Sequence, residues 1–380
     1  MASAASNLER YCPEEQLRRF GTRHFARLKA CADLHERVAQ LAYTFPVLFF
    51  ALATRYGPQQ QRRNVIKLAV EGQPIAVLAA ALELPLCLRR LSPEACRVPL
   101  AYFPWSSDAS LRLASHIPTE SRYASAWLDC VTFAAGACDE EFAIWLASQK
   151  QLRERSNMAA RAVLPLALLA WHSKHTDASH PLHPFAPWEP TLAFPRAVRR
   201  AAVWVRYVQL KFDMGEEELS NPWIERSTFD CFEFHPLLTA RDVAIEATEM
   251  RNCIDTYGYR LVRGCCRLFS MRKFGQRVAT LEVRADFTKH QLLLGQLKGF
   301  ANASCPLEVW HAASNWLEFS AHKFALPTQA RNPVNAEERF RSQLQPYLQG
   351  RDGLPARWMN GLSLYAMNEQ LKSAAELYGC

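Results

Sequence analysis

The chain lacks any run of 18 apolar residues, so no segment is predicted to cross a membrane as a helix. Its most apolar stretches, residues 45–53 and 162–171, are too short to span a bilayer. The first residues lack a basic stretch followed by an apolar run, so we expect no secretory signal. Disorder is excluded as well, because 49% of the residues are hydrophobic and 22% are charged. We therefore expect a globular protein with no membrane association.

Several motifs of known chemistry are absent. No P-loop, GxGxxG, HExxH or GxSxG occurs, so nucleotide hydrolysis by the usual routes is not expected. The 12 cysteines are scattered without a CxxC pair, unlike those of a zinc ribbon or a redox motif. Such thiols are typical of small buried side chains in a reducing compartment, and we expect a cytoplasmic protein. Four histidines between residues 172 and 183 match no metal-binding spacing, so we predict no metal and no cofactor.

The N-terminal part has the sequence pattern of several consecutive helices. A length of 380 residues suggests two domains, or one large domain with appendages. Residues 1–171 are predicted to form a helical domain, because Ala and Leu recur near the helical period and strand signals are scarce. Its predicted helices cover residues 19–41, 62–82, 125–135, 140–150 and 157–171. Residues 172–236 are expected to form a Pro- and His-rich linker that ends in a basic amphipathic helix.

The C-terminal part has a different pattern, which makes the expected fold class α+β. Residues 237–330 are predicted to form a module in which one helix precedes a small three-stranded antiparallel sheet, and residues 331–380 a helical tail. Thr239 and Asp242 fit a capping box. Apolar residues then recur at steps of three and four as far as Leu261, which predicts one helical face with Cys253 turned inward. Gly258 is a candidate break in this helix, after which a second turn or short helix would begin at Tyr259. Alternation predicts strands at residues 266–272, 277–284 and 291–298, before a helix at 307–323.

Positive charge is concentrated in this module. The whole chain carries +8, and the segment from Arg260 to Phe300 contains nine Lys or Arg against Glu282 and Asp286 alone. A concentrated basic surface is what a phosphate-binding protein needs, because counterion release supplies much of its affinity. Solvated hairpin side chains are the alternative explanation. The residues predicted to bind nucleic acid are Arg267, Arg272, Lys273, Arg277, Arg284 and Lys298.

The module also carries an ordered set of polar motifs. These are Met250-Arg251-Asn252-Cys253-Ile254, Tyr257, Phe269-Ser270-Met271-Arg272, Thr280-Leu281-Glu282 and Gln296-Leu297-Lys298-Gly299-Phe300-Ala301-Asn302. Over residues 240–306 they resemble the PcfJ-like protein family of conjugative plasmids and other bacterial mobile elements. That family has a His where this chain has Asn252. The resemblance implies a mobile-element or phage-related setting and no settled biochemical activity.

Three functions remain open from the sequence, and whether the protein is an enzyme is undecided. The leading hypothesis is nucleic-acid binding by the basic sheet module. The second is an enzyme acting on a nucleotide or nucleic acid, with Glu282 as acid or base, and Gln296 and Asn302 positioning the substrate. Cys253 and Tyr257 are further catalytic candidates. The third is a scaffold that binds a protein partner through its helical half, in which the polar residues form a structural network.

Overall fold

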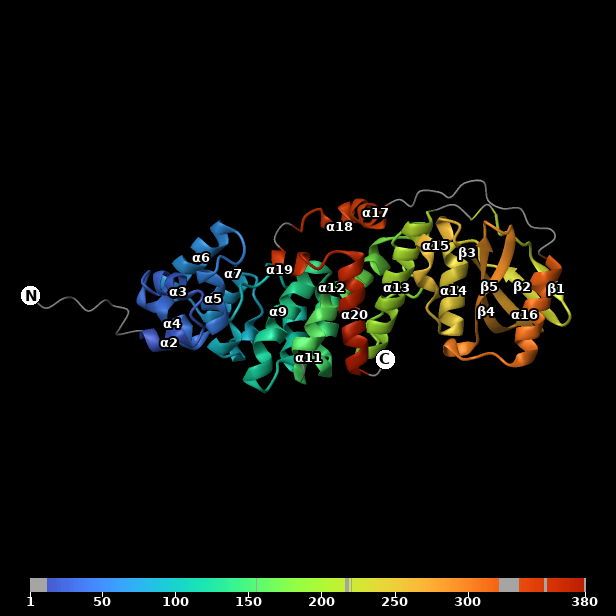
Figure 1. The fold of residues 1–380 in the computed structure, drawn as a ribbon. Coiled ribbons are helices and arrows are strands. Elements are labelled where there is room, and N and C mark those ends of the chain that lie inside the picture. The colour runs from blue at the N-terminus through green and yellow to red at the C-terminus, as the bar shows by residue number, and fades with distance from the viewer. Residues whose placement is uncertain are drawn as a thin grey trace, which may run out of the picture. The chain divides into compact units, whose positions relative to one another are not determined.

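The computed structural model describes residues 12–154, 156–215, 219, 221–320, 335–351 and 354–378. The chain forms two compact units (Figure 1). Unit 1 comprises residues Met1–Ala201 and Pro346–Cys380, and unit 2 comprises Ala202–Gln345. Helices predominate and one antiparallel sheet is present, so the fold is α+β. The unit borders do not coincide with the division at residues 171, 236 and 330 that the sequence suggested.

The described part of unit 1 is helical. Its longer helices are α4 (Glu36–Thr44), α6 (Gln59–Val70), α9 (Ser121–Ala137), α10 (Glu140–Ser148), α12 (Ser156–His175) and the start of α13 (Phe194–Met214), which continues into unit 2. Shorter helices are α2 (Glu14–Arg18), α3 (Phe25–Ala32), α5 (Pro46–Ala53), α7 (Ile75–Ala81), η1 (Leu86–Arg90), η2 (Pro93–Ala95), α8 (Ser107–Leu113), η3 (Ala114–His116), α11 (Lys150–Glu154) and α19 (Ala356–Met359). Helix α20 (Leu364–Tyr378) completes the unit, and α18 (Gln345–Leu348) lies at its border.

Two of the predicted helices are each divided in two. The prediction at residues 62–82 is interrupted at Gly72, which has a left-handed backbone (φ 79°), and at Pro74, from which α7 begins. Proline lacks the N–H that a continuing helix requires. Within the helix predicted at residues 19–41, α3 ends at Ala32. The His35 side chain then caps α4 by accepting a hydrogen bond from the N–H of Arg37. The predicted helices that correspond to α9, α10 and α12 are confirmed.

The core of unit 1 forms around α9. This helix packs against α10 and α12, and α12 packs against α20. Trp127 and Phe133 on α9 are fully buried, and the Phe133 ring stacks on Trp358 with centroids 4.3 Å apart. The C-terminal residues are therefore part of this core. Within the described ranges, we find no helix with the length and apolar character that a membrane crossing requires.

Unit 2 contains a sheet of five antiparallel strands in sequence order. They are β1 (Ser227–Phe229), β2 (Phe232–Pro236), β3 (Cys266–Lys273), β4 (Gln276–Asp286) and β5 (Gln291–Lys298). The three predicted strands are confirmed, but a three-stranded sheet was wrong because β1 and β2 lie in the segment assigned to the linker. Phe232 and Phe234 enter the core while Glu233 and His235 alternate with them, so even this short strand follows the period of two.

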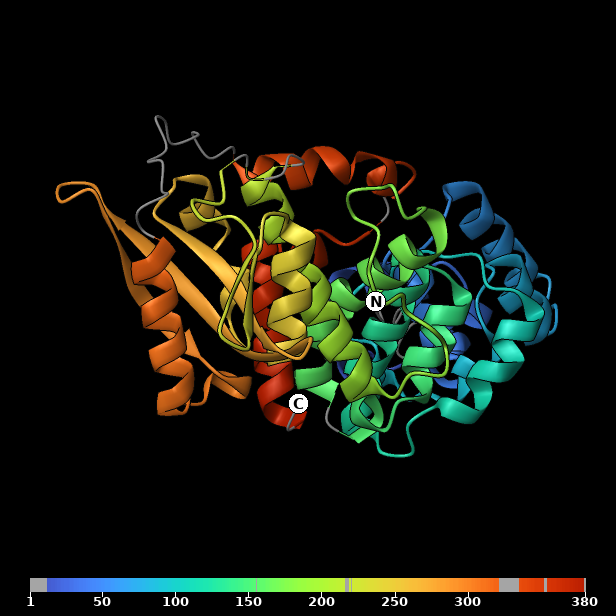
Figure 2. The same ribbon diagram turned by 90° about the vertical axis from the view of Figure 1, so that its right-hand side faces the viewer.

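Helices cover both faces of this sheet (Figures 1 and 2). On one face, α16 (Leu307–Ser320) contributes Trp316, which stacks on Phe234 with centroids 4.1 Å apart and contacts Phe269 edge-on. On the other face, α14 (Ala240–Met250) packs apolar side chains against Leu268 of β3. Strands β1 and β5 are the two edges of the sheet. Helix α17 (Ala336–Gln343) also belongs to this unit.

Helix α14 begins as the sequence predicts and ends earlier. The Thr239 hydroxyl accepts from the N–H of Asp242, whose carboxylate accepts from the N–H of Thr239, so the capping box is confirmed. The helix ends at Met250, because Arg251 adopts a left-handed conformation (φ 49°). Two short helices, η4 (Ile254–Thr256) and α15 (Gly258–Val262), follow. The helix therefore ends before the break expected at Gly258, and α15 is the short helix expected after that break. Cys253 is exposed instead of turned inward.

Candidate functional site

Two buried glutamates lie between α14 and the sheet. Glu246 comes from α14 and Glu282 from β4, and their side chains are 1% and 2% exposed. Leu268 of β3 lies opposite Glu282, and Ser270 lies opposite Thr280, so all four point to the α14 face. A buried carboxylate is costly unless charged or hydrogen-bonding partners compensate for its lost hydration. The partners of these two glutamates therefore define the site.

Glu246 ties α14 to strand β4. Its Oε1 accepts from Thr280 Oγ1 at 3.0 Å, and its Oε2 accepts from Arg277 Nε at 2.8 Å. Asn252 Nδ2 donates to the same Thr280 hydroxyl at 2.9 Å. The sequence reasoning did not single out Glu246, although its place three residues after Val243 put it on the apolar face of the helix. A charged residue on the apolar face of a helix was the sequence signal that could have identified Glu246 as a buried polar residue.

Glu282 is the centre of a second group. Its Oε1 accepts from Arg260 Nη2 at 2.5 Å and from Arg284 Nε at 2.7 Å, and Tyr257 Oη donates to its Oε2 at 3.3 Å. Burial and then the Glu282 charge raise the pKa of the Tyr257 hydroxyl, which therefore remains a donor. The hydrogen bond to Glu282 also raises the pKa of Arg284. Both carboxylate oxygens are thus occupied by protein donors.

A bulge in the sheet makes room for Arg284. The register of β4 and β5 shifts between Glu282 and Val283. A Cβ atom at Gly295 would lie 2.8 Å from Arg284 Nε, closer than real Cβ contacts allow. The missing side chain at residue 295 therefore lets the Arg284 side chain fold back across β5 and reach Glu282. Glycine at this position is needed for space, as expected where another group approaches the backbone closely.

Strand β5 presents polar side chains beside this network. Gln296 lies opposite Glu282, which confirms that the two are on neighbouring strands, and Lys298 lies opposite Thr280. Both Gln296 and Lys298 are exposed. The next turn, η5 (Phe300–Asn302), carries Asn302 in a left-handed conformation (φ 61°), also exposed. The Arg251 guanidinium lies 5.2 Å from the centre of the Phe300 ring, which brings this turn to the C-terminal end of α14.

The six cations predicted to bind nucleic acid do not share one face. Arg272, Arg277, Arg284 and Lys298 lie on the α14 face, whereas Arg267 and Lys273 alternate to the α16 face. Arg267 is 6% exposed and donates to the backbone carbonyls of three residues, Asn221, Leu261 and Cys266. Lys273 pairs with Glu308 at 2.7 Å. Arg267 is therefore a structural residue, and Lys273 belongs to another surface.

Acidic residues from outside the basic segment reduce its local charge. Glu246 lies before Arg260 in the sequence and Glu308 lies after Phe300, and each forms an ion pair with a cation of the segment. Arg260 and Arg284 share the single charge of Glu282. Their guanidinium groups still reach solvent, because the side chains of Arg260 and Arg284 are 36% and 46% exposed. The α14 face therefore combines cations of fixed position with a moderate positive charge.

The remaining catalytic candidates do not assemble around a reactive group. Cys253 lies beyond the end of α14 and is exposed, with Asn252 in place of a histidine next to it. Within the described residues, no group of three or more His, Cys, Asp or Glu is arranged to hold a metal ion. The structure brings Tyr257, Glu282 and Gln296 together, and places Asn302 in the turn that follows β5.

Comparisons with protein-family models, with curated proteins and with solved structures found no match to this chain. The resemblance to the PcfJ-like family therefore stays a prediction from the sequence motifs.

Proposed function

We propose that unit 2 binds single-stranded nucleic acid along the α14 face of strands β4 and β5. The observation that carries this proposal is the anchoring of Arg277, Arg260 and Arg284 on two buried carboxylates. A guanidinium group held in this way keeps N–H groups for a phosphate and loses little conformational freedom on binding. Such positioning of a contact residue by a buried partner is typical of binding sites.

The neighbouring side chains suit the same ligand. Lys298 adds an exposed charge, and the exposed amides of Gln296 and Asn302 can hydrogen-bond to base edges. Phe300 is 52% exposed, and an aromatic ring beside cations is the usual stacking platform for unpaired bases. The PcfJ-like resemblance adds a mobile-element setting to this proposal.

Glu282 acts in this proposal as a positioning residue. Its side chain is 2% exposed and both its oxygens accept hydrogen bonds, so a substrate would have to displace an arginine from Oε1 or Tyr257 from Oε2 to reach it. This geometry favours binding over the alternative in which Glu282 is an acid or base. The two differ in their prediction for Glu282→Gln. If Glu282 is an acid or base, Glu282→Gln should abolish turnover without changing affinity. If Glu282 positions the arginines, the same substitution should weaken ligand binding.

The test is the fluorescence anisotropy of a labelled oligothymidylate and its RNA counterpart over a salt series. Five cations at this site (Arg260, Arg272, Arg277, Arg284 and Lys298) face the two buried glutamates, which leaves about three net positive charges. This predicts a log–log salt slope near −2, because each phosphate contact on a single strand contributes about 0.7. Lys298→Gln should weaken binding and lower the slope by about 0.7. Arg226→Gln is the matched control, because Arg226 precedes β1 at the opposite edge of the sheet. Equal effects of both substitutions, or a slope near zero, would refute the proposal.

A further inference from the structure

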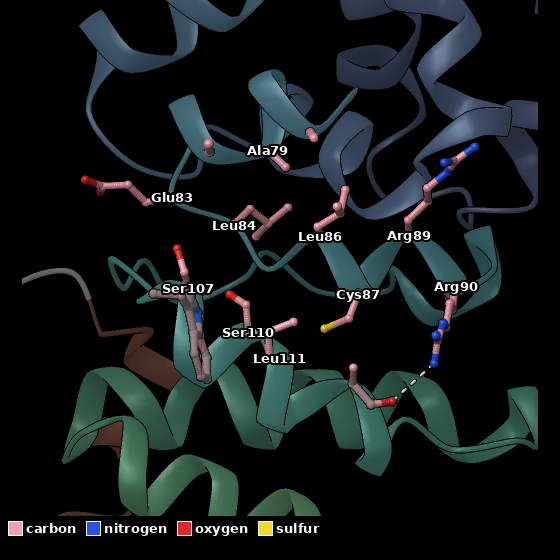
Figure 3. A pocket seen from close by; sticks show the side chains of 14 residues that line it. Ala79, Glu83, Leu84, Leu86, Cys87, Arg89, Arg90, Ser107, Ser110 and Leu111 are labelled. Atoms are coloured by element: carbon pink, nitrogen blue, oxygen red, sulfur yellow. Dashed lines mark hydrogen bonds between the residues drawn. The ribbon is translucent and has the colours of Figure 1, made fainter. Parts of the chain in front are cut away.

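Unit 1 contains a groove that the function proposed above does not use. It has a volume of about 850 Å³ and lies between α7, η1 and α8 (Figure 3). This volume falls within the range of about 300–1,000 Å³ that is usual for small-molecule sites. All of its lining residues belong to unit 1. The groove is therefore independent of the sheet in unit 2.

The middle of the groove is apolar. Half of the lining residues are alanine or leucine, including Ala79, Leu84, Leu86 and Leu111. Leu111 is 76% exposed and Leu86 is 44% exposed, so an occupant would remove a substantial apolar area from water. Burial raises the pKa of the Cys87 thiol to about 11, so this side chain is neutral at ordinary pH and adds to the apolar wall. These residues favour a ligand with an apolar body.

The two ends of the groove carry opposite charges. Figure 3 shows Glu83 at one end, Arg89 and Arg90 at the other, and Leu84, Leu86 and Cys87 between them. Arg89 donates to the carbonyl of Thr44 and Arg90 to that of Ala114, and both guanidinium groups are otherwise exposed. Neither arginine forms an ion pair with a described residue. The arginine end therefore has unused donors for an anionic group.

A buried donor on the wall is open to a water or to a polar group of an occupant. Trp105 lines the groove and is 8% exposed, yet its indole Nε1 has no hydrogen-bond partner among the described residues. Buried donors in native proteins nearly always have a partner, which is a protein group, a water or a ligand. The backbone N–H of Trp105 donates to the carbonyl of Glu83, so this donor belongs to the end opposite the arginines.

From the apolar middle and the arginine end, we propose that this groove binds an amphipathic organic acid, with its apolar body between α7 and α8 and its carboxylate at the end that carries Arg89 and Arg90. A partner helix is the competing occupant for an apolar groove. The volume of about 850 Å³ and the two arginines at one end favour a small molecule with one anionic group.

The test is isothermal titration of the full chain with octanoate, decanoate and dodecanoate below their micelle-forming concentrations. Each added methylene that enters the groove should tighten binding by up to about fourfold. Decanol, which has the same chain length as decanoate and no charge, should bind at least about tenfold more weakly than decanoate. An affinity that ignores chain length, or an alcohol that binds as well as the acid, would overturn the proposal.

Two groove variants and two matched controls locate the site. Leu111→Glu places a charge against the apolar body, and Arg90→Gln removes one contact to the carboxylate. Each should weaken dodecanoate binding by about tenfold. Leu34→Glu is the control for the first, because Leu34 is 57% exposed in unit 1 and lies outside the groove, and the exposed Arg63→Gln is the control for the second. Binding that is equal in the groove variants and the controls would show a non-specific surface, and binding of an acidic amphipathic peptide without any binding of dodecanoate would favour the helix.

Discussion

Replacing Glu246 by Gln tests whether the buried network holds α14 on the sheet. The wild-type carboxylate accepts from Thr280 Oγ1 and from Arg277 Nε. A glutamine amide has a single oxygen, so it accepts from one of these groups and turns its own NH₂ donor toward the other. The Thr280 hydroxyl already accepts from Asn252, and its proton would then have no acceptor.

The expected cost follows from burial. Thr280 is 4% exposed, so its unsatisfied donor should cost about 1–3 kcal/mol of unfolding free energy. The Arg277 side chain is 27% exposed and can turn partly to water, which keeps its share of the cost below the 3–5 kcal/mol typical of a fully buried broken pair. We therefore expect Glu246→Gln to destabilise this region by about 2–3 kcal/mol.

Native-state hydrogen exchange followed by mass spectrometry is the suitable assay, because two units need not unfold in one transition. The loss should appear in peptides that cover α14 and β4. Glu249→Gln is the matched control, because Glu249 lies one turn further along α14 and is exposed. In a double-mutant cycle with Arg277→Gln, the two substitutions should show a coupling of at least about 0.5 kcal/mol. A loss of stability below about 0.5 kcal/mol in Glu246→Gln would refute the structural role of the network. Equal losses in Glu246→Gln and Glu249→Gln would refute it as well.

Three further predictions follow from single contacts. Thr239→Ala removes the N-cap of α14 and should lower its stability by about 1 kcal/mol in the same assay, and no change would contradict the capping box. Burial and then the neighbouring histidines lower the pKa of His172 to about 3, so its contribution to stability is complete above about pH 6.5 and is lost as the pH falls toward 3. Urea unfolding should weaken by up to about 1.4 kcal/mol per pH unit in that window, and His172→Leu should remove this part of the slope. Gly295→Ala should push Arg284 away from Glu282 and cost less than about 1 kcal/mol, because the Arg284 side chain is 46% exposed. The same substitution should have no comparable effect when residue 284 is already Ala.

Local patterns predicted the elements of unit 2 well where those elements are long. Strands β3 and β4 alternate over many residues, and the turn between them contains Phe274 and Gly275 with positive φ angles of 52° and 76°, which suits a tight hairpin. Strand β1 has three residues, too few for alternation to distinguish a strand from a loop. The end of α14 was missed because the left-handed residue is Arg251, and an arginine gives no signal of that conformation.

The candidate site required contacts that no local pattern contains. Glu246 and Thr280 are 34 residues apart, and their hydrogen bond depends on how α14 is turned on the sheet. The charge count from Arg260 to Phe300 also treated the segment as isolated, whereas acids from other elements neutralise part of it. Alternation alone was sufficient to separate Arg267 and Lys273 from the other cations, since residues of odd and even number on β3 face opposite sides.

The neutralisation of the arginines has a consequence for the kind of binding to expect. A surface that depends on unpaired lysines binds any polyanion and weakens steeply with salt. On the α14 face, the buried glutamates cancel part of the charge but fix where Arg260, Arg277 and Arg284 present their remaining donors. Long-range attraction is thereby reduced and the direction of each hydrogen bond is better defined. If the proposed ligand is correct, this unit should therefore discriminate among single strands through the exposed amides near these arginines, and its affinity should depend less on salt than the count of basic residues alone would imply.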